Sequence, residues 1–302
     1  MLLLPLPGAE PLATPLAALL DATSAPPEFR RFPDGESYWR IDCEPQGRDA
    51  VVLAALRDPD PQALGLLFLA DTLREMGARR VVLAAPYLPY MRQDARFRPG
   101  EAVTSRSFGR FVSQAFDGLV TVDPHLHRYA SLDAVYAIPA VVVRSAPAVA
   151  RWLRENVERP FVVGPDAESE QWARDVAERA GCPWQVLRKT RHGDRQVEVT
   201  LPDAAGGAGR TPVLVDDIAS SGHTLAEAAR HVRAAFGVPP LCIAVHGLFA
   251  PEALPLLRQA GAGRVLSCNT VPDASNAIDV LPLFADGMRA LLQRTPPAQA
   301  GV

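Results

Sequence analysis

The chain has 302 residues, 48% hydrophobic and 22% charged, enough to bury the cores of two ordinary domains. A formal net charge of −3 argues against nucleic-acid binding. No apolar run reaches the roughly 18 residues of a membrane span, and the apolar residues 1–12 read as a first strand rather than a signal peptide because they carry no basic residue. The lack of such a run predicts no membrane partner. Four scattered cysteines without CxxC pairing predict a reducing, cytoplasmic location.

Short apolar runs alternate with amphipathic stretches along the chain. We expect strands at residues 51–54, 81–84, 119–122, 161–163, 184–187, 213–215, 241–248 and 264–267. We expect helices at residues 61–77, 104–116, 168–181, 224–236 and 251–261. Residues 197–200 alternate like a local antiparallel strand, and residues 203–211 read as a glycine-rich surface loop. This order predicts an α/β fold with mainly parallel sheets.

The two halves echo each other, so we place a domain boundary near residue 145. The predicted domains are residues 1–145 and 146–295, followed by a flexible tail at 296–302. A crossing of the last helix back to the first domain is the alternative left open. Ligands of open α/β sheets gather at the carboxyl ends of strands. The segments that follow residues 84, 122, 163, 187 and 215 are therefore the candidate binding segments.

The first candidate site is VLVDDIASSGHT, residues 213–224. A buried strand is followed by Asp216 and Asp217, then by small and hydroxyl residues, then by a helix. Backbone N–H groups at a helix N-terminus, with nearby hydroxyls, hold a phosphate monoester. The two carboxylates suit the hydroxyls of an attached sugar. The alternative is a plain polar turn in which Ser221 or Thr224 caps the helix.

The N-terminal half offers two further segments. Residues 86–106 contain four arginines with Tyr87, Tyr90 and Phe97. Guanidinium groups fit phosphate oxygens, and aromatic rings stack on bases. The alternative is a solvated basic loop. Residues 31–41, RFPDGESYWRI, surround a Pro-Gly turn, and alone they favour an ordinary hairpin.

Three strand ends add polar side chains. Asp123, His125 and His127 follow the strand at 119–122, and Asp166 follows the strand at 161–163. Lys189 is the single lysine beside 30 arginines, so it is a candidate for chemistry, although composition alone leaves chance as an equal explanation. Lys189 and Arg191, two apart on a loop, could clamp a transferring diphosphoryl group.

These motifs, in this order over roughly residues 30–290, resemble the ribose-phosphate diphosphokinases, which synthesise phosphoribosyl pyrophosphate (PRPP). The segments RFRPGEAVTSR, TVDPH and RKTR look most like the archaeal-type branch. The resemblance implies two tandem phosphoribosyltransferase-like domains, an ATP side in the first and a ribose 5-phosphate side in the second. It also implies transfer of the diphosphoryl group of ATP to the 1-hydroxyl of ribose 5-phosphate, with Mg²⁺ as cofactor.

The resemblance also assigns roles by matching motif. Lys189 and Arg191 would be the catalytic pair. His125 and Asp166 would sit at the Mg²⁺ site. The ATP contacts would be Phe32, Asp34, Glu36, Arg92, Gln93 and Asp94, the first three reaching in from a neighbouring subunit of a homodimer or higher homo-oligomer. The ribose 5-phosphate contacts would be Asp216, Asp217, Ser220, Ser221, Gly222, His223 and Thr224.

Two departures from the family pattern keep other hypotheses open. Ala167-Glu168-Ser169 replaces glycines or a Lys-Gly pair after Asp166, and could crowd the site and add negative charge. His223 follows Gly222 where a small residue is usual, and would be strained if position 223 required a positive φ. The alternatives are a weakly active regulator that binds PRPP or a nucleotide, and a base phosphoribosyltransferase, which the doubled architecture disfavours.

Overall fold

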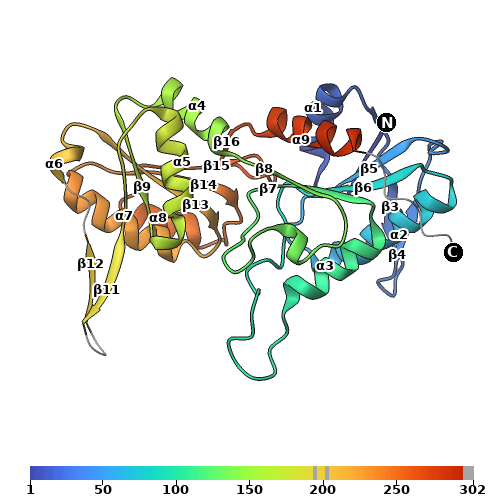
Figure 1. Ribbon diagram of the computed structural model, residues 1–302, viewed down its shortest axis with the longest axis horizontal. Helices are drawn as coiled ribbons and strands as arrows, with labels where there is room; N and C mark the ends of the chain where they lie inside the picture. The colour runs from blue at the N-terminus through green and yellow to red at the C-terminus, as the bar shows by residue number, and fades with distance from the viewer. Residues whose placement is uncertain (193–195, 201–203, 295–302) are drawn as a thin grey trace. The chain divides into compact units, whose positions relative to one another are not determined.

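A computed structural model describes the backbone of residues 1–192, 196–200 and 204–294, and the side chains of these residues outside 189–205. The chain divides into two compact units, residues 1–143 with 281–302, and residues 144–280. Both are α/β units with a mainly parallel sheet flanked by helices, as predicted (Figure 1). Within the described part of the chain, no helix combines the length and apolarity needed to cross a membrane.

Unit 1 is built on a parallel sheet of order β2-β1-β5-β6-β7-β8. Its strands are β1 (Leu2–Pro5), β2 (Thr23–Ser24), β5 (Asp49–Leu53), β6 (Arg80–Ala84), β7 (Gly118–Val122) and β8 (Ala140–Val143). Helices α1 (Glu10–Leu20) and α9 (Leu281–Gln293) cover one face, and α2 (Asp60–Glu75) and α3 (Thr104–Ala115) cover the other (Figure 1). Strands β5, β6 and β7 are buried along their whole length, which explains their continuous apolar sequence.

Helix α9 packs in unit 1 although the sequence between it and β8 forms unit 2. A Cβ atom on Gly287 would lie 2.6 Å from Val143 Cγ2, so glycine permits the close approach of α9 to the sheet. The predicted range 146–295 assigned this helix to the second domain, whereas the structure has it in unit 1. The alternative, in which the last helix crosses back to the first domain, agrees with the structure. The predicted tail at 296–302 lies outside the described residues.

Unit 2 repeats the architecture with a parallel sheet of order β10-β9-β13-β14-β15-β16. Its strands are β9 (Pro160–Gly164), β10 (Trp184–Val186), β13 (Thr211–Ala219), β14 (Leu241–Gly247), β15 (Arg264–Cys268) and β16 (Asn276–Ile278). Its helices are α4 (Ala146–Asn156), α5 (Glu170–Ala180), α6 (Ala204–Gly207), α7 (His223–Phe236) and α8 (Ala253–Gln259). Leu225, Ala229 and Val232 of α7 pack with Leu214, Cys242 and Ala244 of the sheet in one apolar cluster.

Two antiparallel hairpins stand apart from the main sheets: β3 (Glu28–Arg31) with β4 (Ser37–Arg40), and β11 (Arg188–His192) with β12 (Gln196–Thr200). The predicted antiparallel strand at 197–200 is therefore confirmed.

Three other expectations differ from the structure. Lys189 and Arg191 were expected on a loop, but their backbone belongs to strand β11. The predicted loop 203–211 contains the short helix α6, and β13 continues four residues beyond the predicted end at Val215. Short 3-10 turns at Leu132–Ala134 and Ala167–Ser169 complete the elements.

Candidate functional site

The segment from Ala219 to Thr224 joins β13 to the N-terminus of α7 in unit 2. Gly222 adopts a φ of +78°, which favours glycine, and His223 is the first residue of the helix. The anticipated strain at His223 therefore does not arise. Backbone N–H groups of Leu248 and Ala250 donate to the carbonyls of Ala219 and Ser220, which fixes the loop against the next strand's end.

This loop has the form of an anion cradle. The first N–H groups of a helix have no partner within the helix, and the helix dipole favours negative charge there. Ser221, His223 and Thr224 are exposed at this end of α7, where their side chains can reach a phosphate. The predicted contacts of this segment with a phosphate monoester stay a prediction.

Asp216 and Asp217 lie within β13 rather than after it, and both are buried. Burial raises the pKa of the Asp216 carboxyl well above its ordinary value, and the negative charges of Asp217 and Asp166 raise it further. The predicted residues Asp166, Asp216 and Asp217 thus form one acidic group inside unit 2. Such a group is compensated by hydroxyl donors or by a cation.

Asp166 ends β9 and caps the turn that follows. Its Oδ1 accepts hydrogen bonds from the backbone N–H groups of Glu168 and Ser169, at 3.1 and 3.0 Å, and Ser169 Oγ lies 3.2 Å from the Asp166 N–H. This reciprocal cap gives the unusual Ala167-Glu168-Ser169 sequence a well-formed turn. The Glu168 side chain is exposed, so it does not crowd the buried acidic group.

In unit 1, the predicted ATP segment is fastened on both sides of Arg92. Tyr90 has a φ of +64°, and its hydroxyl donates to Asp60 at the start of α2. Burial, the hydrogen bond to Asp60, and the charges of Asp60 and Asp58 raise the pKa of Tyr90 to about 12. Met91 is buried, whereas Arg92 is exposed.

Downstream of Arg92, Ser105 Oγ donates to the carbonyl of Gln93 at 3.2 Å. Arg128 forms an ion pair with Asp94 at 2.8 Å, and the Tyr129 hydroxyl donates to the Asp94 carbonyl at 3.1 Å. Asp94 is buried, so its carboxylate is turned toward the Arg128 guanidinium rather than toward solvent. The arrangement presents the Arg92 side chain from a fixed backbone.

The strand end after β7 lies beside this segment, because β6 and β7 are neighbours in the sheet. Asp123 is buried with a φ of +32°, a conformation that non-glycine residues rarely adopt. His125 Nδ1 and His127 Nε2 are 3.1 Å apart, so the two rings form a contacting pair. Arg128 then reaches back to Asp94, which joins the two predicted segments.

The remaining predicted residues are placed as follows. Phe32, Asp34 and Glu36 form the turn of the β3–β4 hairpin and are exposed. Asp34 Oδ1 accepts a hydrogen bond from the Glu36 N–H at 3.2 Å. Lys189 and Arg191 lie on β11, but their side chains are outside the described residues, so their predicted catalytic roles stay predictions.

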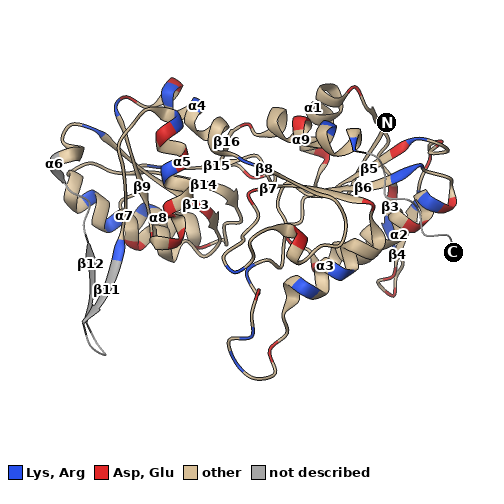
Figure 2. Cartoon of the chain, in the orientation of Figure 1, with Lys and Arg blue, Asp and Glu red and all other residues tan. Residues whose placement is uncertain are grey.

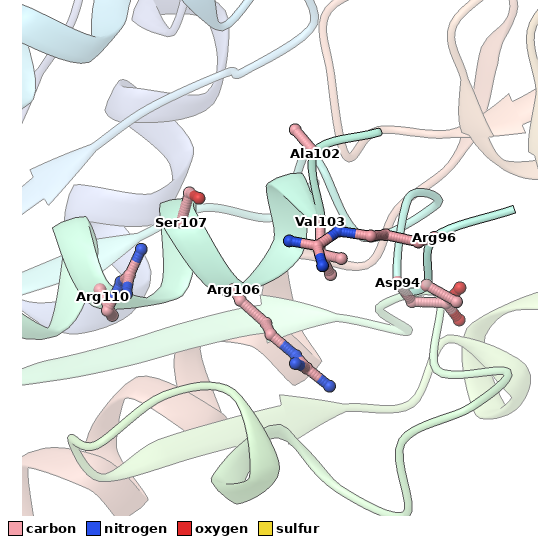
Figure 3. A pocket seen from close by; sticks show the side chains of 8 residues that line it. Asp94, Arg96, Ala102, Val103, Arg106, Ser107 and Arg110 are labelled. Carbon is pink, nitrogen blue, oxygen red and sulfur yellow. The ribbon is translucent and has the colours of Figure 1, made fainter. Parts of the chain in front are cut away.

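The sequence analysis grouped the basic residues up to Arg106 but did not extend the group to Arg110, which completes a basic pocket beside α3. A cavity of about 680 Å³ is lined by Asp94, Arg96, Ala102, Val103, Arg106, Ser107 and Arg110 among others (Figure 3). Arg106 and Arg110 are four residues apart, about one helical turn, and therefore lie on one face of α3, a helix on which basic residues recur (Figure 2). That spacing was the signal available in the sequence. Tyr90, Ser105 and Tyr129 were also not assigned positioning roles, because their partners are distant in sequence.

Comparisons with known proteins agree with this geometry. Residues 1–115 match the family model described as the N-terminal domain of ribose phosphate pyrophosphokinase, and residues 131–283 match the phosphoribosyl transferase domain. The ribose-phosphate pyrophosphokinase of Methanopyrus kandleri is 36% identical over 91% of this chain and 94% of its own. The chain belongs to the ribose-phosphate pyrophosphokinase family.

Other family members support the same assignment. The ribose-phosphate pyrophosphokinase of Methanothermobacter thermautotrophicus is 32% identical over 93% of this chain and 98% of its own. The crystal structure of phosphoribosylpyrophosphate synthetase from Mycobacterium smegmatis aligns with a TM-score of 0.84 at 27% identity, over 96% of this chain and 98% of its own. The predicted family, the doubled fold and the enzyme class are confirmed.

Proposed function

We propose that this chain transfers the diphosphoryl group of ATP to the 1-hydroxyl of ribose 5-phosphate, producing PRPP and AMP for nucleotide biosynthesis. The observation that carries the proposal is the β13–α7 segment. A buried acidic pair is followed by a loop in which Gly222 has a positive φ, and then by the free N–H groups at the start of a helix. A sugar phosphate needs both parts, because its hydroxyls require acceptors and its phosphate requires N–H donors.

In this proposal the backbone N–H groups at the start of α7, with Ser221 and Thr224, hold the 5-phosphate. Asp216 and Asp217 accept hydrogen bonds from the ribose hydroxyls. The sugar is thereby oriented with its 1-hydroxyl oxygen toward the β-phosphorus of ATP. Positioning of this kind supplies much of the rate enhancement in phosphoryl-type transfers, because little covalent chemistry falls to the protein.

The transfer forms a bond between that oxygen and the β-phosphorus. It breaks the bond between the β-phosphorus and the oxygen that bridges the α- and β-phosphates, so AMP departs with that oxygen and the hydroxyl proton is released. Arg92 and Gln93 bind ATP from the fastened segment of unit 1. Lys189 and Arg191 place positive charge against the diphosphoryl oxygens as negative charge builds up.

The acidic group of unit 2 fits a magnesium ion, because carboxylate oxygens are the ligands that Mg²⁺ prefers and because the three carboxylates repel one another without a cation. Asp166, and His125 in unit 1, are the residues proposed to hold it. When bound, the ion neutralises diphosphate charge.

Release of AMP rather than ADP tests the proposal, because AMP marks transfer of two phosphoryl groups together. We expect AMP to form only when ATP, Mg²⁺ and ribose 5-phosphate are all present, and the rate to fall at least a hundredfold in Lys189→Ala. Binding of ribose 5-phosphate without any AMP would favour the regulatory alternative, for which the Ala167–Ser169 sequence was the reason. The capped turn at Asp166 and the exposed Glu168 side chain speak against crowding, and the added negative charge is the ground on which that alternative still stands.

A further inference from the structure

One outer edge of the unit 2 sheet is only partly covered. Strand β15 pairs with β14 from Arg264 to Ser267, whereas β16 pairs with β15 only at Ser267 and Cys268. Among the described elements, residues 264–266 therefore have a neighbouring strand on one side only. An uncovered strand edge offers its backbone N–H and C=O groups to another chain.

Val265 directs its backbone groups to this open side. The N–H group of Ser267 donates to the carbonyl of Ser275, just before β16, at 2.9 Å. Successive residues of a strand in a parallel sheet point their backbone hydrogen-bonding groups alternately to its two sides, so Val265 faces the same side as Ser267. No described strand lies there at Val265. An added strand would find one donor and one acceptor at this position.

A cavity of about 280 Å³ lies at the same edge, and we call it the β15-edge groove. Helix α8 contributes Leu254 and Arg258 to its lining, β15 contributes Arg264 and Val265, and the segment before β16 contributes Ser275. The volume is just below the range of about 300–1,000 Å³ that whole small-molecule ligands occupy. The groove therefore suits one or two side chains of an extended segment better than a cofactor.

The β15-edge groove is basic. Arg258 and Arg264 line it and are exposed. Arg233 of α7 lies close by, because its Nη1 would be 2.5 Å from a Cβ atom on Gly261. None of these three guanidinium groups forms an ion pair with a carboxylate in the part of the chain that the structure describes. Arg264 instead lies 5.8 Å from the ring of Trp152.

The charge of the groove favours an acidic occupant. No described carboxylate lines it. Asp273, the closest acidic residue along the chain to Ser275, is already engaged, since its Oδ1 accepts hydrogen bonds from the Ser275 N–H and hydroxyl at 2.9 and 2.7 Å. Three cations without counter-ions are unusual on a chain of net charge −3, and complementary charge on a partner gives specificity and a faster encounter.

We propose that the β15-edge groove binds an extended acidic segment of a partner protein, which adds a strand beside residues 264–266. The main chain of the segment pairs with the N–H and C=O groups of Val265. One of its apolar side chains enters the groove beside Leu254, and its carboxylates face Arg258 and Arg264. In strand addition the main-chain hydrogen bonds supply affinity, and pockets for alternate side chains supply specificity.

The groove is separate from the candidate phosphate loop. Strands β13, β14 and β15 run parallel, and the loop follows the last residue of β13, Ala219, whereas the groove begins at the first residue of β15, Arg264. The two therefore lie toward opposite ends of the sheet. A partner bound in the groove leaves the proposed substrate site open, so partner binding and AMP release are separate properties.

Fluorescence anisotropy tests the chemistry of the occupant. The probe is a labelled Val-Glu-Val-Glu-Val peptide. Its counterparts are Val-Lys-Val-Lys-Val, which reverses the charge, and Val-Glu-Pro-Glu-Val, which lacks a main-chain N–H. We expect saturable binding of the acidic probe, at least tenfold weaker binding of the lysine peptide and at least fivefold weaker binding of the proline peptide. Absence of saturable binding, or equal affinities for the three peptides, would overturn the proposal.

Substitution of the two lining arginines tests the groove. Arg258→Gln/Arg264→Gln is expected to weaken binding of the acidic probe at least tenfold, with far-ultraviolet circular dichroism and AMP release at native levels. Arg151→Gln/Arg174→Gln is the matched control, because these arginines of α4 and α5 are also exposed and lie outside the groove. Equal losses of affinity in the two variants would show charge attraction without a site, and would contradict the assignment.

Amide hydrogen exchange tests strand addition directly. The Val265 amide is expected to exchange at least tenfold more slowly when the native chain is saturated with the acidic probe, because its hydrogen then has a partner. Saturation without slower exchange at Val265 would rule out an added strand. Protection that appears without the peptide and grows with protein concentration would make a second copy of this chain the occupant, and would also overturn the proposal.

Discussion

At the scale of single residues, the phosphate loop depends on where the positive φ falls. Gly222 carries it, which relieves His223 of strain and lets α7 begin immediately after the glycine. The sequence could place the loop, because its motif is local. It could not say which residue was left-handed, because that depends on packing: a Cβ atom on Gly222 would lie 3.3 Å from the Ala253 Cβ.

Gly222→Ala is expected to cost about 1–2 kcal/mol of stability, the usual cost of a left-handed alanine, and to weaken ribose 5-phosphate binding at least tenfold. Gly181→Ala is the matched control, because Gly181 has a φ of +69°, ends α5 and has open space around it. Denaturant unfolding and titration calorimetry measure the two effects. Equal losses of affinity in both variants would contradict a specific role for the loop.

Asp216→Asn is expected to stabilise the ligand-free chain at neutral pH and to weaken ribose 5-phosphate binding. The folded chain favours the protonated carboxyl, because burial and the nearby carboxylates raise its pKa. Stability from this group is therefore complete below its unfolded pKa and is lost as pH rises through its folded pKa. Melting temperatures at pH 4 and pH 8 measure this. If Asp216→Asn raised the melting temperature no more at pH 8 than at pH 4, the account would be contradicted.

At the scale of elements, hydrogen bonds to two neighbouring helices hold the loop around Arg92 in a fixed conformation. Tyr90 joins it to α2, and Ser105 joins it to α3. The strands and helices that frame it were predictable from the hydrophobic pattern. The fastening contacts were not, since Tyr90 and Asp60 are 30 residues apart and no local pattern pairs them.

Tyr90→Phe is expected to raise the KM for ATP severalfold with a smaller change in kcat, because it loosens the backbone that presents Arg92. The unchanged KM for ribose 5-phosphate serves as the internal reference. Tyr136→Phe removes a different tyrosine hydroxyl of unit 1, a buried one whose contact is the sulfur of Met91 at 3.7 Å. This change is expected to leave the KM for ATP near the native value. Steady-state kinetics decide the matter, and equal effects from both changes would argue against the Tyr90 fastening.

Helix α9 is attached to unit 1 by an ion-pair cluster. Burial opposes ionisation of Asp49, but hydrogen bonds from Arg80 and Arg79 outweigh it and lower its pKa. Arg80 also donates to the carbonyls of Leu292 and Arg294 at the end of α9, at 2.8 and 3.0 Å. The same side chain therefore serves the sheet and the helix.

Arg80→Ala is expected to destabilise the chain by about 3 kcal/mol, because it leaves a buried carboxylate short of its partner. Arg79→Ala should cost less, since Arg79 is 59% exposed. Because the folded pKa of Asp49 is lowered, this stabilisation is present above the unfolded pKa and lost as pH falls. Urea unfolding at pH 7 and pH 3 measures it. An Arg80→Ala effect of the same size at both pH values would contradict this reading.

At the scale of the whole molecule, the repeat of alternating strands and helices predicted two α/β domains correctly. It left the membership of α9 open, because membership is decided by contacts such as Gly287 with Val143, far apart in sequence. Nor did it show that Asp216 and Asp217 are inside β13, since a run of apolar residues ends before the strand does. The acidic pair and the predicted phosphate loop could nevertheless be located in the sequence, because the residues that form them are consecutive.

The most direct test of the account is ³¹P NMR of the purified chain with ATP, Mg²⁺ and ribose 5-phosphate, beside Lys189→Ala. The account predicts that the β- and γ-phosphorus signals of ATP disappear together, that AMP and a 1-diphosphate ester of ribose 5-phosphate appear in equal amounts, and that the variant gives neither. Formation of ADP with a singly phosphorylated sugar, or an unchanged ATP spectrum in the presence of bound ribose 5-phosphate, would contradict diphosphoryl transfer.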